Sequence, residues 1–121
     1  MTNYIGGVIL PANDQQIPTR AESALALILD KLGGSEGPVA VGSVADALMA
    51  IATNDEDVMV KAEIAPRRTR FLPLLGSLID QRLVAQNIDG FELTPEGRKV
   101  ASSYLDKHKN VAERMVVALT E

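Results

Sequence analysis

Apolar residues recur at helical spacing directly after a helix-start signal near position 19 of the chain. Thr19 is followed three residues later by Glu22, which is the spacing of a capping box. Gly33 and Gly34 supply the stop signal. The pattern therefore predicts an amphipathic helix over residues 19–33. Its apolar face consists of Ala21, Ala24, Leu25, Ile28, Leu29 and Leu32.

A short valine-rich stretch and a second helical pattern follow the two glycines. The stretch GPVAV at residues 37–41 is too short for a helix and is typical of a short strand. Ser43 and Asp46 then repeat the cap spacing, and the second helix is expected to end near residues 53–57. Its apolar face consists of Val44, Ala47, Leu48, Ile51 and Ala52.

Residues 54–65 are compatible with two structures. The run VMVKAEI at residues 58–64 could extend as a strand or coil into a short helix. We expect the short helix, because Val58, Met59 and Ala62 share one helical face and an acidic start signal precedes them.

A third helical pattern spans residues 66–83 and contains a proline. Pro66 fits the first turn of a helix. Pro73 lies inside the pattern, where a proline removes a hydrogen bond and clashes with the preceding turn. The helix therefore either bends at Pro73 or starts there. Its apolar side consists of Phe71, Leu74, Leu75, Leu78, Ile79 and Leu83.

Residues 84–93 carry the clearest β signal of the chain. Apolar and polar residues alternate on both sides of Asp89-Gly90, a dipeptide typical of hairpin turns. Directly afterwards, Thr94 is a helix cap and Pro95 fits the first helical position. The sequence therefore predicts a β hairpin that leads straight into a helix.

The last pattern is a long helix that runs from Pro95 nearly to the C-terminus. Apolar residues alternate steps of four and three along it, which is a heptad-like spacing. The seam consists of Ala101, Leu105, His108, Ala112, Met115 and Leu119. Because one subunit would struggle to cover this seam and the valines beside it, we expect residues 96–121 to pair two subunits in a homodimer. The alternative is that the helix folds back over its own core.

The charge of the chain is unevenly distributed along its 121 residues, a length that suggests one domain. Residues 1–63 carry three basic and nine acidic side chains, whereas residues 64–121 carry nine basic and seven acidic ones. The net charge of −4 disfavours nonspecific binding of nucleic acid by the whole surface. The asymmetry between the halves is still a reason to look for a local basic face.

The residue types disfavour several classes of function. The chain has no cysteine and one histidine, so we expect no metal site. We find no glycine-rich phosphate loop or nucleophile elbow, so we expect neither an enzyme nor a cofactor. The apolar stretch at residues 4–10 is too short to span a membrane and is a poor signal peptide, so we expect a cytoplasmic location and no membrane partner.

The stretch LGSLIDQRLVAQNIDGFELTPEGRKVASSYL at residues 75–105 resembles the winged helix-turn-helix family, in particular MarR-like and PadR-like bacterial and archaeal regulators. The stretch GPVAVGSVADAL is similar to the first strand and second helix of that family. The resemblance covers roughly residues 19–105. It implies a mainly α fold with a small β hairpin, namely a winged helix-turn-helix domain with a long C-terminal helix. Three regions follow from it: an N-terminal arm at residues 1–18, a winged-helix domain at 19–95 and a dimerisation helix at 96–121.

The same resemblance implies that the third helix enters the major groove of duplex DNA. Three arginines precede or open this helix, and two basic residues follow the hairpin, or wing. Arginine and lysine suit contacts with phosphates and guanine edges. The predicted DNA contacts are Arg67, Arg68, Thr69, Arg70, Ser77, Arg98 and Lys99. The alternative is that the arginines pair with the acidic residues 55–57 or with Glu63 in the same molecule.

The chain also departs from the family pattern. The segment between the second and third helices is long, and the wing is short and carries no basic residue. If Phe71, Leu75 and Leu78 point inward, the third helix presents few side chains that read bases. Two hypotheses therefore stand. The first is a dimeric transcriptional regulator that binds duplex DNA sequence-specifically; the alternative is a winged-helix module that binds another protein and no DNA, of the phage or plasmid accessory or inhibitor type.

Overall fold

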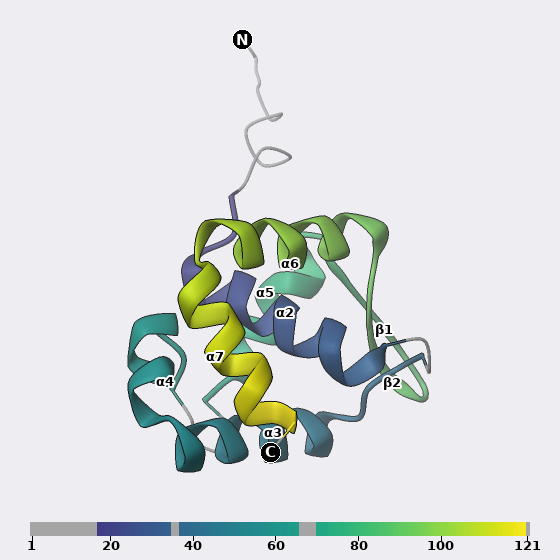
Figure 1. The fold of residues 1–121 in the computed structure, drawn as a ribbon. Coiled ribbons are helices and arrows are strands. Elements are labelled where there is room, and N and C mark those ends of the chain that lie inside the picture. The colour runs from purple at the N-terminus through teal and green to yellow at the C-terminus, as the bar shows by residue number, and fades with distance from the viewer. Residues whose placement is uncertain (1–16, 35–36, 66–69, 121) are drawn as a thin grey trace, which may run out of the picture.

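The computed structural model describes residues 17–34, 37–65 and 70–120, which form a mainly helical fold with one β hairpin (Figure 1). Within these residues, six helices account for 70% of the structure. The predicted mainly α fold with a small hairpin is confirmed. In the numbering of Figure 1 the elements are α2 (Arg20–Gly33), α3 (Val41–Asn54), α4 (Glu56–Ala62), α5 (Leu72–Asp80), β1 (Val84–Asn87), β2 (Gly90–Leu93), α6 (Pro95–Lys107) and α7 (Lys109–Thr120).

Helix α2 forms the centre of the fold. Residues 25–28 are each at most 1% exposed, so four consecutive positions of the helix are buried. The helix contacts the other five helices and β2, and α7 crosses in front of it in Figure 1. A helix that is apolar all round belongs in the interior of a core. The predicted stripe is therefore correct but too narrow, because Ala26 and Leu27 are buried as well.

The caps of α2 and α6 form as their sequence signals predict. The Glu22 amide donates to the Thr19 hydroxyl at 3.1 Å, and the Thr19 amide donates to the Glu22 carboxylate at 3.0 Å. At the start of α6, the Gly97 amide donates to the Thr94 hydroxyl at 3.1 Å. Each cap satisfies an amide that has no partner inside its own helix.

The predicted start of α3 is wrong, whereas the predicted helix α4 is present. Helix α3 begins before Ser43, with Ala40 at the N-cap position and no side-chain cap bond, so the predicted Ser43 cap is wrong. The Ser43 and Val44 amides donate to the Ala40 carbonyl, so the first turn starts three residues before the predicted cap. The predicted short helix α4 is confirmed, and Asp55 caps it.

The hairpin pairs Val84–Asn87 with Gly90–Leu93, and a third segment adds to it at one point. Asn87 is opposite Gly90, so the turn itself is residues 88–89, one position earlier than the predicted Asp89-Gly90 turn. The predicted strand at residues 37–41 is reduced to a single bridge between Val39 and Phe91, with N–H···O distances of 2.7 and 2.8 Å. The order across the sheet is therefore Val39, β2, β1.

Two glycines are required by close backbone contacts around this hairpin. Gly90 has φ 138°, and a Cβ at this position would lie 2.4 Å from the Val39 carbonyl oxygen. A Cβ on Gly97 would lie 2.0 Å from the Leu83 carbonyl oxygen. The first turn of α6 thus packs directly on the chain that enters β1, and the LTPEG step has a steric reason for its glycine.

Pro73 lies at the start of α5 and does not bend it. Helix α5 begins at Leu72, which places Pro73 in the first turn, where its missing amide costs no hydrogen bond. Pro66 and the arginines at positions 67 and 68 lie outside the described residues. Of the two alternatives left open by the sequence, the structure has the one in which the helix starts at the proline.

The prediction of one long C-terminal helix is wrong. Helix α6 ends at Lys107, His108 has φ −125° and ψ 49°, and α7 begins at Lys109. Helix α7 folds back and contacts α2, α3 and α4 (Figure 1). Of the predicted dimer seam, Ala101, Ala112 and Met115 are at most 1% exposed within the single chain. These side chains cover the central helix, because burial in the chain's own core is available to them without a partner; the pairing of subunits itself stays a prediction.

Candidate interaction face

The outward side of α5 is apolar and acidic. Phe71, Leu75 and Leu78 are at most 2% exposed, as the sequence predicts for the inward side. The outward positions are Leu72, Pro73, Gly76 and Asp80, all exposed. Leu72 keeps 43% of its surface in solvent. Because the whole helix contains no basic residue, it offers no arginine or lysine for the edges of bases.

Ser77, one of the predicted DNA contacts, is partly buried on α5. Its hydroxyl accepts from the Gln81 side chain at 3.1 Å, and Gln81 also donates to Glu22 at 3.0 Å. These residues form a polar link between the end of α5 and the start of α2. Ser77 is half-buried in this link, so its hydroxyl is used inside the molecule.

Glu22 is the buried carboxylate of this link, with 7% of its surface exposed. Burial alone raises the pKa of Glu22, but hydrogen bonds from Ser77, from Thr19 and from Gln81 together bring that pKa below its ordinary value. The carboxylate therefore stays ionised and holds α2 and α5 in register. The capping-box spacing predicted the bond to Thr19, but no local signal marked Ser77 and Gln81 as further donors.

The tip of the hairpin exposes a second apolar side chain. Ile88 is 99% exposed, and the Asp89 amide beside it donates to the Asn87 side-chain oxygen at 2.8 Å. The strands carry Glu92 and, as the sequence already indicates, no basic residue. A hairpin tip with an isoleucine and an aspartate is poorly suited to phosphates, which repel the carboxylate.

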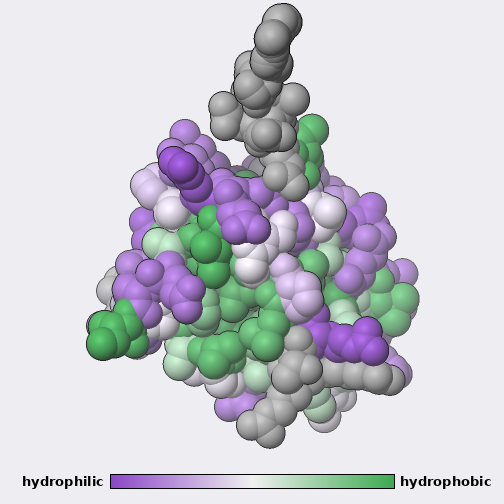
Figure 2. All heavy atoms as spheres, turned by 180° about the vertical axis from the view of Figure 1, so that it is seen from behind, coloured by the Kyte–Doolittle hydropathy of each residue, from purple (hydrophilic) through white to green (hydrophobic). Residues whose placement is uncertain are grey.

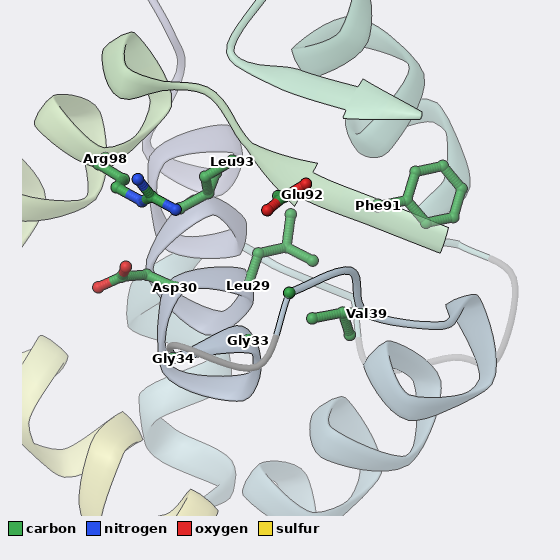
Figure 3. Close-up of a pocket in the computed structure, with 10 residues that line it drawn as sticks. Leu29, Asp30, Gly33, Gly34, Val39, Phe91, Glu92, Leu93 and Arg98 are labelled. Atoms are coloured by element: carbon green, nitrogen blue, oxygen red, sulfur yellow. The ribbon is translucent and has the colours of Figure 1, made fainter. Parts of the chain in front are cut away.

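Of the predicted DNA-contacting residues that the structure describes, Arg98 and Lys99 line different surfaces. Arg67, Arg68 and Thr69 lie outside the described residues, and Arg70 is exposed just before α5. Arg98 lines a small polar hollow of about 20 Å³ together with Asp30 and Glu92 (Figure 3).

Lys99, the neighbour of Arg98, faces a different surface. It lines a groove of about 450 Å³ beside Arg20 and Ser23, at the other end of α2 from Asp30. Arg98 and Lys99 therefore line hollows at opposite ends of α2.

The alternative that Arg70 pairs with the acidic residues nearby is not what the structure shows. Asp55 and Asp57 bind Arg114 of α7, and Glu63 lies 3.7 Å from Arg20. Arg70 forms no ion pair with any residue in the described part of the chain. No local sequence signal marks Arg114 as the partner, since it lies 59 residues from Asp55.

A continuous hydrophobic area is visible on the side of the molecule opposite to the view of Figure 1 (Figure 2). Helix α5 lies behind α2 in Figure 1 and is therefore on the near side in Figure 2. Hydrophilic side chains border the area (Figure 2). We use the name recognition face for exposed residues of two separate elements, namely Leu72, Pro73, Gly76 and Asp80 of α5 and Ile88 and Asp89 of the hairpin tip.

The described ranges contain neither a cluster of metal-ligating side chains nor a helix able to cross a membrane. No group of three or more histidine, aspartate or glutamate residues there is arranged to hold a metal ion. None of the described helices has the length and apolar character of a transmembrane segment. Comparison of the chain with protein-family models, curated proteins and solved structures gives no significant match.

Proposed function

We propose that the chain is a winged helix-turn-helix domain that uses its recognition face to bind another protein. The order helix, bridge, helix, helix, hairpin supports the fold assignment, with α2, Val39, α3, α5 and the β1–β2 pair as its parts. Helix α4 is then an insertion between the second and third helices of the motif. In this architecture α5 and the hairpin tip are the parts that meet a partner.

The observation that carries the choice of a protein partner is the exposure of Leu72 and Ile88. They keep 43% and 99% of their surfaces in solvent on the two elements that would meet DNA. Exposed apolar patches rimmed by polar residues mark contact sites on soluble proteins. Asp80 and Asp89 on the same elements add negative charge. The complementary partner is an apolar protein surface bordered by lysine or arginine.

Duplex DNA is the second candidate, and Arg70 is the observation that favours it. Arg70 is exposed at the start of α5 and is preceded in sequence by Arg67 and Arg68. Three arginines at the start of a recognition helix would contact phosphates. Each lost contact of this kind lowers the logarithmic salt slope of binding by about 0.9.

A selection experiment with three variants tests the first candidate. Random displayed peptides are selected on the unmodified protein, and binding is then measured to Leu72→Lys, Ile88→Lys and the control Val60→Lys. Val60 on α4 is 71% exposed and lies outside the recognition face, so it matches the chemistry of the change. We expect peptides rich in apolar and basic residues whose affinity falls about tenfold or more with the first two variants and stays unchanged with the control.

The DNA candidate is measured in parallel by fluorescence polarisation of a random duplex across a salt series. A salt-dependent complex that Arg70→Ala weakens, together with equal peptide binding by all three lysine variants, would contradict the protein-partner proposal. The absence of a complex at low salt agrees with it.

A further inference from the structure

The break between α6 and α7 contains neither of the two strongest helix breakers, glycine and proline. Residues 98–121 include neither glycine nor proline. Only His108 departs from helical geometry, with φ −125° and ψ 49°. The His108 amide donates to the Tyr104 carbonyl at 2.8 Å, and the Ala112 amide donates to the His108 carbonyl at 2.8 Å. The helical pattern of hydrogen bonds therefore reaches the break from both sides.

Straightening the chain at His108 would complete the helix. The amides of residues 109–111 open α7, and the first amides of a helix have no carbonyl partner within it. In one continuous helix, these amides would donate to the carbonyls of residues 105–107. Local energetics thus favour a straight helix from Pro95 to Thr120, as the sequence pattern also predicts.

Burial of α7 opposes the straight form in a single chain. Ala112 and Met115 are fully buried and Ala118 is 4% exposed, all against the chain's own core. Arg114 adds two bonds to Asp55 and one to Asp57. A single chain that straightened would expose this apolar face and leave the place of α7 on α2, α3 and α4 empty. Such a loss is prohibitive unless another helix of the same shape and charge fills that place.

We propose that two copies of this chain exchange α7, so that each α6–α7 straightens at His108 and each α7 packs on the α2, α3 and α4 of its partner. The partner is a second copy because it supplies the same small residues and the same arginine opposite Asp55. Every contact of α7 with those three helices is kept, and only its contact with α6 is replaced by the continuous helix. Short connections of this kind favour domain exchange. The exchange of α7 does not depend on the recognition face. The exchanged dimer contains two such faces.

A proline at position 109 separates the two forms. Lys109 is the first residue of α7, where proline is tolerated, and His108 before it already lies outside the helical region. In the straight helix the same proline would remove a hydrogen bond and clash with the Leu105 carbonyl. The matched control is Lys109→Ala, which removes the same side chain and permits both forms.

The measurement is size-exclusion chromatography with light scattering after the proteins are unfolded and refolded at high concentration. We expect dimers for the unmodified protein and for Lys109→Ala. For Lys109→Pro we expect a dimer fraction lower by about tenfold or more, and a monomer that melts at the same temperature as the unmodified monomer. A refolded wild type that is monomeric throughout, or equal dimer fractions for the two variants, would overturn the proposal.

A charge-exchange pair shows whether α7 itself is exchanged. In Asp55→Arg two arginines face each other across the α7 contact, and in Arg114→Asp the new carboxylate faces those of Asp55 and Asp57. Mixed and refolded together, the two variants restore an opposite pair at both contacts only if each α7 packs on the other chain. We expect a heterodimer that melts above either variant alone, even if Asp55→Arg, which also loses the α4 cap, does not fold by itself. A mixture that melts like its separate components would contradict the exchange.

Discussion

The Arg114 guanidinium of α7 binds the carboxylate of Asp55, the residue that caps α4, through two nitrogen–oxygen bonds. The Nε–Oδ2 distance is 2.9 Å, and one terminal nitrogen also donates to Asp57 at 3.2 Å. The two side chains are 32% and 25% exposed. Hydrogen bonding to Arg114 lowers the pKa of Asp55, outweighing the opposite effect of burial. One contact therefore fixes the start of α4 and holds α7 on the core.

Arg114→Ala is expected to lower the melting temperature at neutral pH, because it frees α7 and leaves the cap carboxylate without its partner. The folded pKa of Asp55 is depressed below the ordinary value of 3.8. Its contribution is therefore complete above that value and is lost as the pH falls through the folded pKa. The difference in melting temperature between wild type and variant, followed by circular dichroism from about pH 7 to about pH 3, should shrink toward the acid end.

Lys61→Ala is the control for that experiment. It removes the exposed Lys61–Asp57 pair at 3.6 Å, which belongs to the weak class of surface ion pairs. A pH-independent loss in Arg114→Ala, or an equal loss in Lys61→Ala, would contradict the role given to the Asp55–Arg114 contact.

Glu22→Gln is expected to destabilise the protein by about 1–3 kcal/mol, because a carboxamide cannot accept all the hydrogen bonds that the buried carboxylate accepts. Since the folded pKa of Glu22 is below its ordinary value, the wild-type advantage should be present at neutral pH and decline as the pH falls through the folded pKa. Urea denaturation at two pH values measures the difference in the free energy of unfolding between the wild type and the variant. Glu96→Gln in the exposed first turn of α6 serves for comparison and should cost much less; equal losses would show that the buried link is unimportant.

Gly97→Ala and Gly76→Ala are expected to change stability in opposite directions. A Cβ at position 97 would meet the Leu83 carbonyl oxygen at 2.0 Å, so this variant should lose more than about 2 kcal/mol. No heavy atom lies within 4 Å of a Cβ at position 76, so alanine there should stabilise α5 by about 0.5–1 kcal/mol. Chemical denaturation of both proteins checks the sign of each change. A harmless alanine at position 97 would show that α6 does not pack on the Leu83 backbone.

Met115→Glu and Val117→Glu distinguish the buried and exposed faces of α7. Met115 is fully buried, and an unpaired charge there should cost several kcal/mol, roughly 3 or more, and unfold much of the protein. Val117 is 54% exposed on the same helix, and its variant should keep a melting temperature close to that of the wild type. A folded, stable Met115→Glu protein would mean that α7 is not part of this core.

The sequence determined the elements whose signals lie within one helical turn or one hairpin. Thr19 with Glu22, and Thr94 before Pro95, mark helix starts because a cap bond joins residues that are close along the chain. The inward side of α5 also followed from spacing alone, since Phe71, Leu75 and Leu78 recur at the helical period. The position of the hairpin was predicted to within one residue at its turn.

The candidate site was predicted only in part. Spacing placed the outward side of α5 and showed that it presents few side chains suited to reading the bases of DNA. It did not reveal that Ser77 and Gln81 form a link with Glu22, because Glu22 accepts from a Gln81 side chain 59 residues away in the sequence. Nor did it reveal that Leu72 and Ile88 stay exposed, since exposure is decided by what the rest of the chain leaves uncovered.

Only the tertiary structure decided the break at His108 and the partners of α7. The apolar spacing from Pro95 onward favours a single helix, and neither glycine nor proline interrupts the chain after Gly97. The chain breaks there because burying Ala112 and Met115 on α2, α3 and α4 outweighs the few hydrogen bonds that a straight helix would gain. The pairing of Arg114 with Asp55 depends on the same event, since α7 must fold back before the two charges can meet.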